Sequence, residues 1–197
     1  MSVERFVVTG LLWGVWCLLH SLLTRDRTLS RTGVADTWVG RYYGLAYSAV
    51  ATATLGAVYR LTPREGEAVL FEWDGWTVVV PAAAWLLAVT VMCVAFRTMG
   101  ASRLLGLHSR ARPEKLITHG VYGIVRHPQY ASGLLMLWCR DIRETDLAMN
   151  LVLTPYLFLG AGIEERRLTA EFGQDYKRYM ARVPGFFPVI FRTSPNT

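Results

Sequence analysis

Trp76–Phe96 reads WTVVVPAAAWLLAVTVMCVAF, an apolar stretch without a charged side chain. A helix needs about 20 predominantly apolar residues to cross the hydrocarbon core of a bilayer, and this stretch has that length. Pro81 lies in its first turns, where proline is tolerated because the first backbone N–H groups of a helix have no partner inside it. The stretch therefore predicts a membrane-spanning helix in an integral membrane protein.

Two further stretches on the N-terminal side have the same character. Phe6–Leu23 meets the length that a span requires, and so does Tyr42–Leu61. Tyr42, Tyr43 and Tyr59 lie near the ends of the latter, where amphipathic rings prefer the membrane–water interface. Together with the first stretch, they predict three membrane helices.

An apolar hairpin is predicted in the C-terminal half. Pro128 suits the first position of a helix, and the apolar run that follows it continues to about Cys139. Such a helix would be about 18 Å long, too short to cross a bilayer alone. The polar stretch Arg140–Asp146 separates it from a second apolar helix, from Leu147 to about Ile163.

The segments on either side of this hairpin are polar. Arg97–His127 is basic and contains glycines, so we expect a loop with short helical pieces. Glu164–Tyr179 is polar and helix-prone, and Pro184-Gly185 breaks the helical pattern after it.

These elements predict an all-α fold, a polytopic membrane bundle of about five transmembrane helices whose last two form the hairpin. We expect one integral membrane domain over residues 1–197. Residues 1–99 would be its three-helix membrane part, and residues 100–197 would carry its chemical motifs.

Composition and charge agree with a membrane protein. The chain is 52% hydrophobic with 21 Lys+Arg against 15 Asp+Glu. The basic residues lie between the apolar runs rather than along one helix face, which argues against nucleic-acid binding. Because cytoplasmic segments are enriched in Lys and Arg, five crossings with the N-terminus outside place the Arg-rich segments and the C-terminus in the cytoplasm. Three cysteines without paired spacing predict neither a disulfide framework nor a metal site.

The first chemical motif spans Leu116–Tyr130 and joins a flexible Gly120 to the pair Arg126-His127, just before the helix start at Pro128. Helix N-termini attract anions, and the planar fork of an arginine suits a carboxylate. The motif therefore predicts an anion-binding corner at the membrane surface. An arginine that anchors the chain to lipid headgroups is an equally good interpretation of the spacing alone.

The second motif is Glu164-Glu165, which follows the last apolar run and precedes Arg166-Arg167. Carboxylates at the mouth of a membrane span need partners. They could hydrogen-bond a polar ligand or orient Arg126. A solvated helix end is the simpler alternative.

Both motifs resemble those of the isoprenylcysteine carboxyl methyltransferase-like superfamily of membrane methyltransferases. Its patterns, G-x-Y-x-x-x-R-H-P-x-Y and E-E-x-x-L-x-x-x-F-G-x-x-Y-x-x-Y, are matched at every letter from Gly120 to Tyr130 and from Glu164 to Tyr179. The resemblance covers about the last hundred residues. Shorter matches at His20-Ser21, Arg41-Tyr42-Tyr43 and Leu105-Gly106-Leu107 resemble the NnrU and methanethiol S-methyltransferase branch.

The resemblance implies a methyltransferase that uses S-adenosyl-L-methionine, bound by a cytoplasmic C-terminal segment. Its partners would be membrane lipids and a small or lipophilic methyl acceptor, with no nucleic acid and no obligate protein partner. The membrane would be the inner, cytoplasmic membrane of a bacterium. The implied catalytic residues are Arg126 and Glu165, and the implied cofactor-binding residues are Leu116, Gly120, Val121, Tyr122, Arg126, His127, Pro128, Tyr130, Glu164 and Glu165. Arg126 and His127 would hold the methionyl carboxylate, and Glu165 or His127 would be the candidate base.

A second hypothesis follows from the same branch. NnrU-like proteins include accessory factors that transfer no methyl group, and the haem protein zeta-carotene isomerase also resembles NnrU. His20 could accordingly be a haem ligand, help to bind an acceptor, or be hydrogen-bonded to a neighbouring helix.

Overall fold

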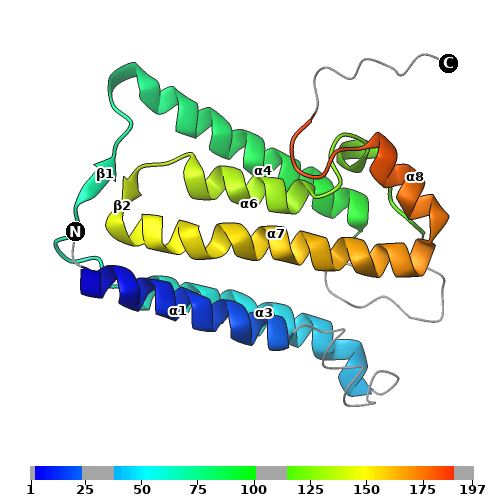
Figure 1. Cartoon of the computed structure of the whole chain (residues 1–197), viewed down its shortest axis with the longest axis horizontal. Coiled ribbons are helices and arrows are strands. Elements are labelled where there is room, and N and C mark those ends of the chain that lie inside the picture. Colours follow the sequence, from blue (N-terminus) through cyan, green and yellow to red (C-terminus); the bar gives the residue numbers. More distant parts are fainter. Residues whose placement is uncertain (1–2, 24–37, 101–114, 189–197) are drawn as a thin grey trace.

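The computed structural model describes residues 3–23, 38–100 and 115–188 (Figure 1). These residues are mostly helical, and a small two-stranded sheet lies at one end of the bundle. The helices are α1 (Val3–Leu22), α3 (Trp38–Leu61), α4 (Val79–Met99), α6 (Pro128–Trp138), α7 (Glu144–Phe172) and α8 (Gln174–Arg182), with 3-10 turns η1 (Gly75–Val78) and η2 (Gly120–Gly123) and strands β1 (Val69–Phe71) and β2 (Ile142–Arg143).

The long helices lie side by side with nearly parallel axes (Figure 1). α1 packs along α7, α4 packs along α6, and α6 joins the two pairs by contacting α7. α1, α4 and α7 run in one direction along the bundle, and α3 and α6 run in the other. This arrangement places the end of α4, the start of α6 and the end of α7 at the same end of the molecule.

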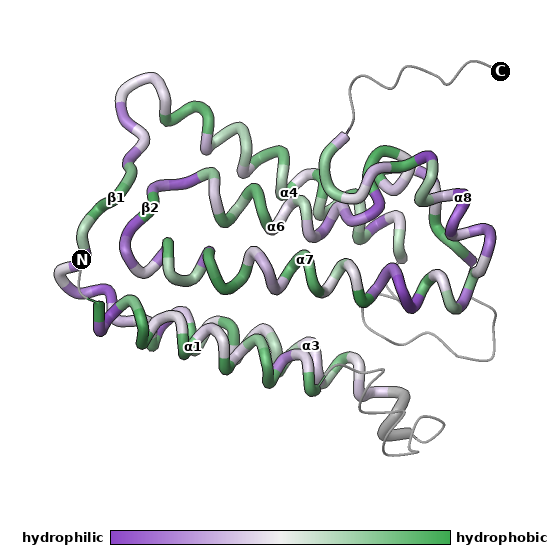
Figure 2. Tube along the Cα trace, viewed as in Figure 1, coloured by the Kyte–Doolittle hydropathy of each residue, from purple (hydrophilic) through white to green (hydrophobic). Residues whose placement is uncertain are grey.

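Most residues of α4 and α1 are apolar, as Figure 2 shows, and many of their large apolar side chains are exposed. Leu11, Leu86 and Leu159 are each more than 60% exposed. Apolar side chains turned outward from a helical bundle are what contact with lipid requires. Among the described residues, three helices are long and apolar enough to cross a membrane: Val3–Leu22, Gly75–Met99 and Glu144–Phe172.

The predicted span Tyr42–Leu61 is helical and lies within α3, but α3 is not among these three candidates. Thr52, Thr54 and Arg60 lower its average hydropathy. The predicted helix at Pro128 is α6, with proline at its first position; it has 11 residues and is, as expected, too short to cross a bilayer alone.

The boundaries of α7 differ from the prediction at both ends. The helix has 29 residues, from Glu144 to Phe172, instead of ending near Ile163. Glu164-Glu165 are therefore inside a continuous helix. Gly173, with φ of 57°, ends it, since this left-handed conformation suits glycine, and α8 begins at the next residue.

The polar stretch Arg140–Asp146 is not a simple helical turn. Its residues Ile142–Arg143 form β2, which pairs antiparallel with β1 and adds a small sheet to the predicted all-α fold. Glu144, Thr145 and Asp146 are at most 3% exposed.

Ion pairs explain how these charges are buried. Asp146 Oδ1 lies 2.9 Å from Arg140 Nη2 and 3.5 Å from Arg64 Nη1, and Glu144 Oε2 lies 3.3 Å from Arg5 Nη1. These contacts tie together α1, the segment after α3 and the start of α7. We call them the distal ion network, because they lie at the start of α7 (Glu144–Phe172), whereas Glu165 lies in the last third of that helix.

Candidate functional site

Arg126 precedes α6 and uses all three of its side-chain nitrogens. Nε and Nη2 donate to Glu165 Oε1 at 3.0 and 2.6 Å. Nη1 donates to the carbonyl oxygens of Met180 at 3.2 Å and Val183 at 2.5 Å. The guanidinium thus joins the start of α6 to α7 and to the chain that leaves α8.

His127 caps α6 and is 3% exposed. Its Nε2 lies 3.0 Å from Glu165 Oε1, and its Nδ1 lies 3.8 Å from Glu164 Oε2. The ring therefore has a carboxylate near each nitrogen. The rings of Tyr130 and Phe186 pack against it, with centroids at 5.6 and 5.5 Å.

The segment Val183–Phe186 is part of the site, although the sequence pattern marks Pro184-Gly185 only as a helix break. The backbone N–H groups of Arg126 and His127 donate to the carbonyl oxygens of Pro184 and Gly185 at 2.8 and 2.9 Å. We call Val183–Phe186 the C-terminal strap. The two backbone donors just before α6 are used by this strap, so the predicted anion-binding corner is occupied there by the chain's own carbonyl groups.

The turn before α6 is fixed by α8. Tyr179 donates from its hydroxyl to the carbonyl oxygen of Tyr122 at 2.5 Å, and Gln129 Nε2 donates to the Tyr122 hydroxyl at 2.7 Å. Burial raises the pKa of Tyr179 and raises that of Tyr176 to about 12, so both phenols keep their protons at neutral pH. Gly120 begins this turn with φ of 62°.

The structure thus brings together Arg126, His127, Glu164 and Glu165, and we call these four residues the polar cluster. Pro128 starts α6 beside it. Of the other predicted residues, Leu116, Gly120 and Val121 precede the cluster, and η2 packs against α4. Among the contacts of the described residues, none joins Leu116, Gly120 or Val121 directly to the polar cluster.

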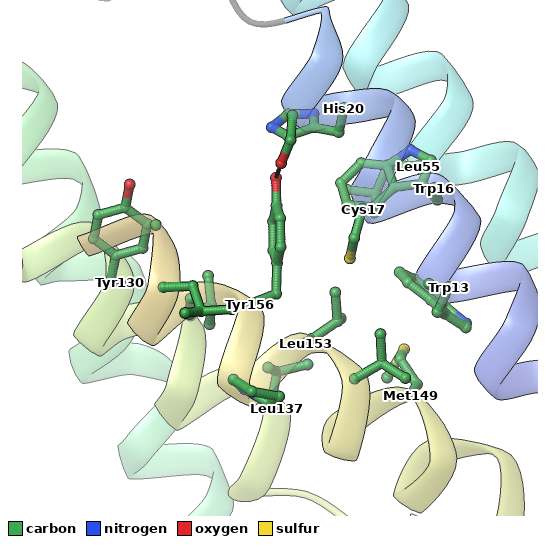
Figure 3. Close-up of a pocket in the computed structure, with 18 of the residues that line it drawn as sticks. Trp13, Trp16, Cys17, His20, Leu55, Tyr130, Leu137, Met149, Leu153 and Tyr156 are labelled. Atoms are coloured by element: carbon green, nitrogen blue, oxygen red, sulfur yellow. Dashed lines mark hydrogen bonds between the residues drawn. The ribbon is translucent and has the colours of Figure 1, made fainter. Parts of the chain in front are cut away.

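A large cavity opens next to the polar cluster. It has a volume of about 1760 Å³ and is lined by α1, α3, α6 and α7 (Figure 3). Its lining is largely aliphatic and aromatic, as for Trp13, Leu137 and Leu153. Of the predicted site residues in the described chain, Tyr130 and Glu164 line it.

Polar groups lie at the end of the cavity nearest the cluster. The Tyr130 phenol and the Glu164 carboxylate both line this end of the cavity. Ser21 Oγ donates to the Tyr156 hydroxyl at 3.1 Å, which links α1 to α7 across the cavity (Figure 3). Arg167 also lines the cavity.

His20 lines the same cavity and lies among aromatic rings. Its ring stacks on Trp16 with centroids 4.8 Å apart, and the Tyr47 hydroxyl lies 3.0 Å from Nε2. The sequence-based option of a hydrogen bond to a neighbouring helix matches this contact. In the described ranges, no group of three or more His, Cys, Asp or Glu residues could hold a metal ion.

Comparisons with known proteins identify relatives along most of the chain. The chain is 25% identical to methanethiol S-methyltransferase 1 of Bradyrhizobium diazoefficiens over 202 residues, covering 95% of this chain and 68% of that protein. It is 29% identical to methanethiol S-methyltransferase of Pseudomonas deceptionensis, over 68% of this chain and 51% of that protein. It is 32% identical to protein-S-isoprenylcysteine O-methyltransferase B of Arabidopsis thaliana, over 41% of this chain and 43% of that protein.

The chain therefore spans about half the length of the latter two relatives. No family model and no solved structure matches it. The relatives of both kinds are methyltransferases, and those that act on methanethiol match a larger share of this chain. These relatives support the resemblance that the two motifs indicate, to the isoprenylcysteine carboxyl methyltransferase-like superfamily of membrane methyltransferases, with the methanethiol S-methyltransferases as the nearer branch.

Proposed function

We propose that this protein is an integral membrane methyltransferase that uses S-adenosyl-L-methionine to methylate a lipophilic or small thiol, carboxylate or amine acceptor at the cytoplasmic membrane face. One observation carries the proposal. Arg126 and Glu165 are 39 residues apart in sequence, yet they meet within hydrogen-bond distance beside an apolar cavity. A solvated helix end, or an arginine that anchors the chain to lipid headgroups, would not require Arg126 and Glu165 to meet.

The residues present suit the cofactor. S-adenosylmethionine carries a cationic sulfonium and an ammonium group, and Glu164 supplies a carboxylate at the surface of the cavity. Ligand pockets usually have volumes of about 300–1000 Å³, so a cavity of about 1760 Å³ has room for the cofactor and an acceptor together. Leu116, Gly120, Val121 and Tyr122 would border the adenosine.

The contacts of Arg126 support a positioning role. Each of its side-chain nitrogens already donates to Glu165, Met180 or Val183. Arg126 would hold Glu165, and with it His127, in place for the ligand rather than grip the methionyl carboxylate alone. A planar fork with fixed donor directions suits this task better than the point charge of a lysine.

Methyl transfer depends more on the alignment of the acceptor with the methyl group than on a strong acid or base. When bound, the sulfonium supplies a methyl group on a good leaving group. The chain must then hold the acceptor in line with that group and keep water out, and alignment of this kind can supply several kcal/mol. The apolar lining between α1 and α7 would exclude water and admit an acceptor from the bilayer.

The helix directions support the proposed orientation. α1, α4 and α7 run one way and α3 and α6 the other, the alternation that the proposed five-crossing topology requires, with α6 and the connector after it together making the fourth crossing. The polar cluster lies at the end of α7 that carries Arg166-Arg167. Because Arg-rich ends face the cytoplasm, we propose an outside N-terminus and a cytoplasmic C-terminus in a bacterial inner membrane.

The first test is calorimetric binding of S-adenosylhomocysteine to the protein in detergent. We expect a dissociation constant in the micromolar range, lost in Arg126→Ala and Glu165→Ala. Glu171→Ala, an exposed position on the same helix, is the matched control and should bind as the wild type does. A radiolabelled methyl-transfer screen over short thiols, prenylcysteine, fatty acids and phosphatidylethanolamine would then identify the acceptor.

Failure of the folded protein to bind S-adenosylhomocysteine would contradict the proposal. A Soret absorption band in protein purified without added haem, abolished by His20→Ala, would instead support the haem-protein hypothesis.

A further inference from the structure

The two adjacent glutamates have different surroundings. Glu165 Oε1 receives three contacts, from Arg126 Nε, Arg126 Nη2 and His127 Nε2, all within 3.0 Å. Glu165 is absent from the cavity lining. Glu164 lines the cavity beside Tyr130, and its side chain is 35% exposed. The Glu165 carboxylate is therefore hydrogen-bonded within the protein, and the Glu164 carboxylate faces the space in which an acceptor would lie.

From this difference we infer that Glu164 is the base that takes the proton of a neutral thiol or amine acceptor, while Glu165 and Arg126 position His127 behind it. The inference rests on the proposed function, because it concerns the acceptor side of the same reaction. It adds Glu164 to the catalytic residues and makes Glu165 a positioning residue.

His127 provides a hydrogen-bond acceptor for the protonated Glu164 side chain. A neutral imidazole has one N–H, and its Nε2 lies close to Glu165 Oε1 at 3.0 Å. If Nε2–H donates there, Nδ1 carries a lone pair that faces Glu164 Oε2 at 3.8 Å. A small rotation of the Glu164 side chain would let its carboxylic acid O–H donate to Nδ1. Because His127 is 3% exposed, water competes little for that lone pair.

Other groups at this end of the cavity are compatible with this role. Arg167 lies one helical turn after Glu164 and also lines the cavity, so it adds a positive charge near the Glu164 carboxylate. The Tyr130 phenol is on the facing helix α6. Its hydroxyl hydrogen-bonds the Glu164 side chain and can therefore orient the carboxylate.

The proposed step is balanced. The S–H or N–H proton of the acceptor passes to the Glu164 carboxylate. The acceptor lone pair forms the bond to the methyl carbon as the carbon–sulfur bond of the sulfonium donor breaks, and that electron pair stays on the donor sulfur. A cationic donor, a carboxylate and a neutral acceptor become a neutral thioether, a carboxylic acid and a neutral methylated product.

The test compares an alkanethiol with the alkaneselenol of the same chain length under reducing conditions. A selenol is ionised at neutral pH and needs no base, whereas a thiol is mostly protonated. We expect Glu164→Gln to lower the rate with the thiol by about 100-fold or more, since general base catalysis contributes roughly 10²–10⁴-fold. With S-adenosylmethionine at saturating concentration, the rate with the selenol should change little, and Glu164→Asp should recover part of the thiol rate.

Binding of S-adenosylhomocysteine provides an independent measurement. The affinity for S-adenosylhomocysteine, which lacks the sulfonium charge, should fall less in Glu164→Gln than in Glu165→Gln, which disturbs Arg126 and His127. Glu171→Gln is the matched control for both measurements, because Glu171 is exposed on α7 away from the cavity lining.

Equal losses with thiol and selenol in Glu164→Gln would overturn the assignment of the base and leave the proposed methyltransferase function standing. A wild-type protein that binds no S-adenosylhomocysteine and methylates neither acceptor would overturn both. The two failures are thus distinguishable.

Discussion

Arg126 is the residue on which three parts of the chain depend. Its donors go to Glu165 on α7, to Met180 on α8 and to Val183 in the C-terminal strap. The guanidinium is 14% exposed, so water replaces these contacts poorly when they are lost. The ammonium group of a lysine could donate to only one of these three parts of the chain at a time.

We therefore predict that Arg126→Lys, although it keeps the charge, destabilises the protein by about 2 kcal/mol, a typical cost when a charged hydrogen-bonding group loses its partners. It should also weaken S-adenosylhomocysteine binding nearly as much as Arg126→Ala does. Thermal unfolding in detergent and calorimetry measure the two effects. Arg166→Lys, at an exposed position on α7, is the control and should change neither. Wild-type behaviour of Arg126→Lys would show that charge alone is sufficient.

At the scale of elements, Gly173 decides where α7 ends and α8 begins. Its φ of 57° lies in the left-handed region, and an added Cβ there would meet no atom within 4 Å. Any cost of replacing this glycine is therefore one of backbone conformation and not of space. α8 depends on this turn, because its buried Tyr179 must reach the carbonyl oxygen of Tyr122.

We predict that Gly173→Ala lowers the free energy of unfolding by about 1–2 kcal/mol, the cost of a left-handed conformation in a residue with a Cβ. Gly162→Ala is the matched control: Gly162 lies within α7, where an added Cβ also meets nothing within 4 Å. There alanine should stabilise the helix by about 0.5–1 kcal/mol. Thermal unfolding of both variants checks the predicted opposite signs, and equal effects would contradict this account of the α7–α8 turn.

At the scale of the whole molecule, the two ends of the bundle have separate tasks. The polar cluster joins α6, α7 and the strap at one end, and the distal ion network joins α1, the segment after α3 and the start of α7 at the other. Asp146 and Glu165 are separated along α7 by about 28 Å, at 1.5 Å of rise per residue. Stability contributed by the distal network should therefore be separable from ligand binding.

We predict that Asp146→Ala destabilises the protein by about 3–5 kcal/mol, because it leaves Arg140 and Arg64 without the carboxylate that they share. At a temperature where the variant is folded, its affinity for S-adenosylhomocysteine should equal that of the wild type. Asp175→Ala breaks an ion pair with Arg178 that is more than 60% exposed and should cost less than about 1 kcal/mol. Thermal unfolding and calorimetry provide both measurements, and an unchanged unfolding temperature in Asp146→Ala would refute the structural role of the network.

Much of the fold follows from local sequence features. The apolar lengths at Phe6–Leu23 and Trp76–Phe96 give helices long and apolar enough to cross a membrane, and the proline at residue 128 starts α6, because both features act within one helix. The charged connector at Arg140–Asp146 was less predictable. Its burial depends on Arg5 and Arg64, which come from distant parts of the chain.

The site divides in the same way. The sequence by itself determined which residue types could form it, because the Arg126-His127 and Glu164-Glu165 motifs carry their chemistry locally, and their order resembles that of the superfamily. Only the tertiary structure decided that Glu164 faces the cavity and Glu165 faces Arg126, and that the C-terminal strap binds the backbone before α6. Two identical neighbours on a helix point about 100° apart, at 3.6 residues per turn, and the packing of α6 against α7 determines which of them meets the arginine.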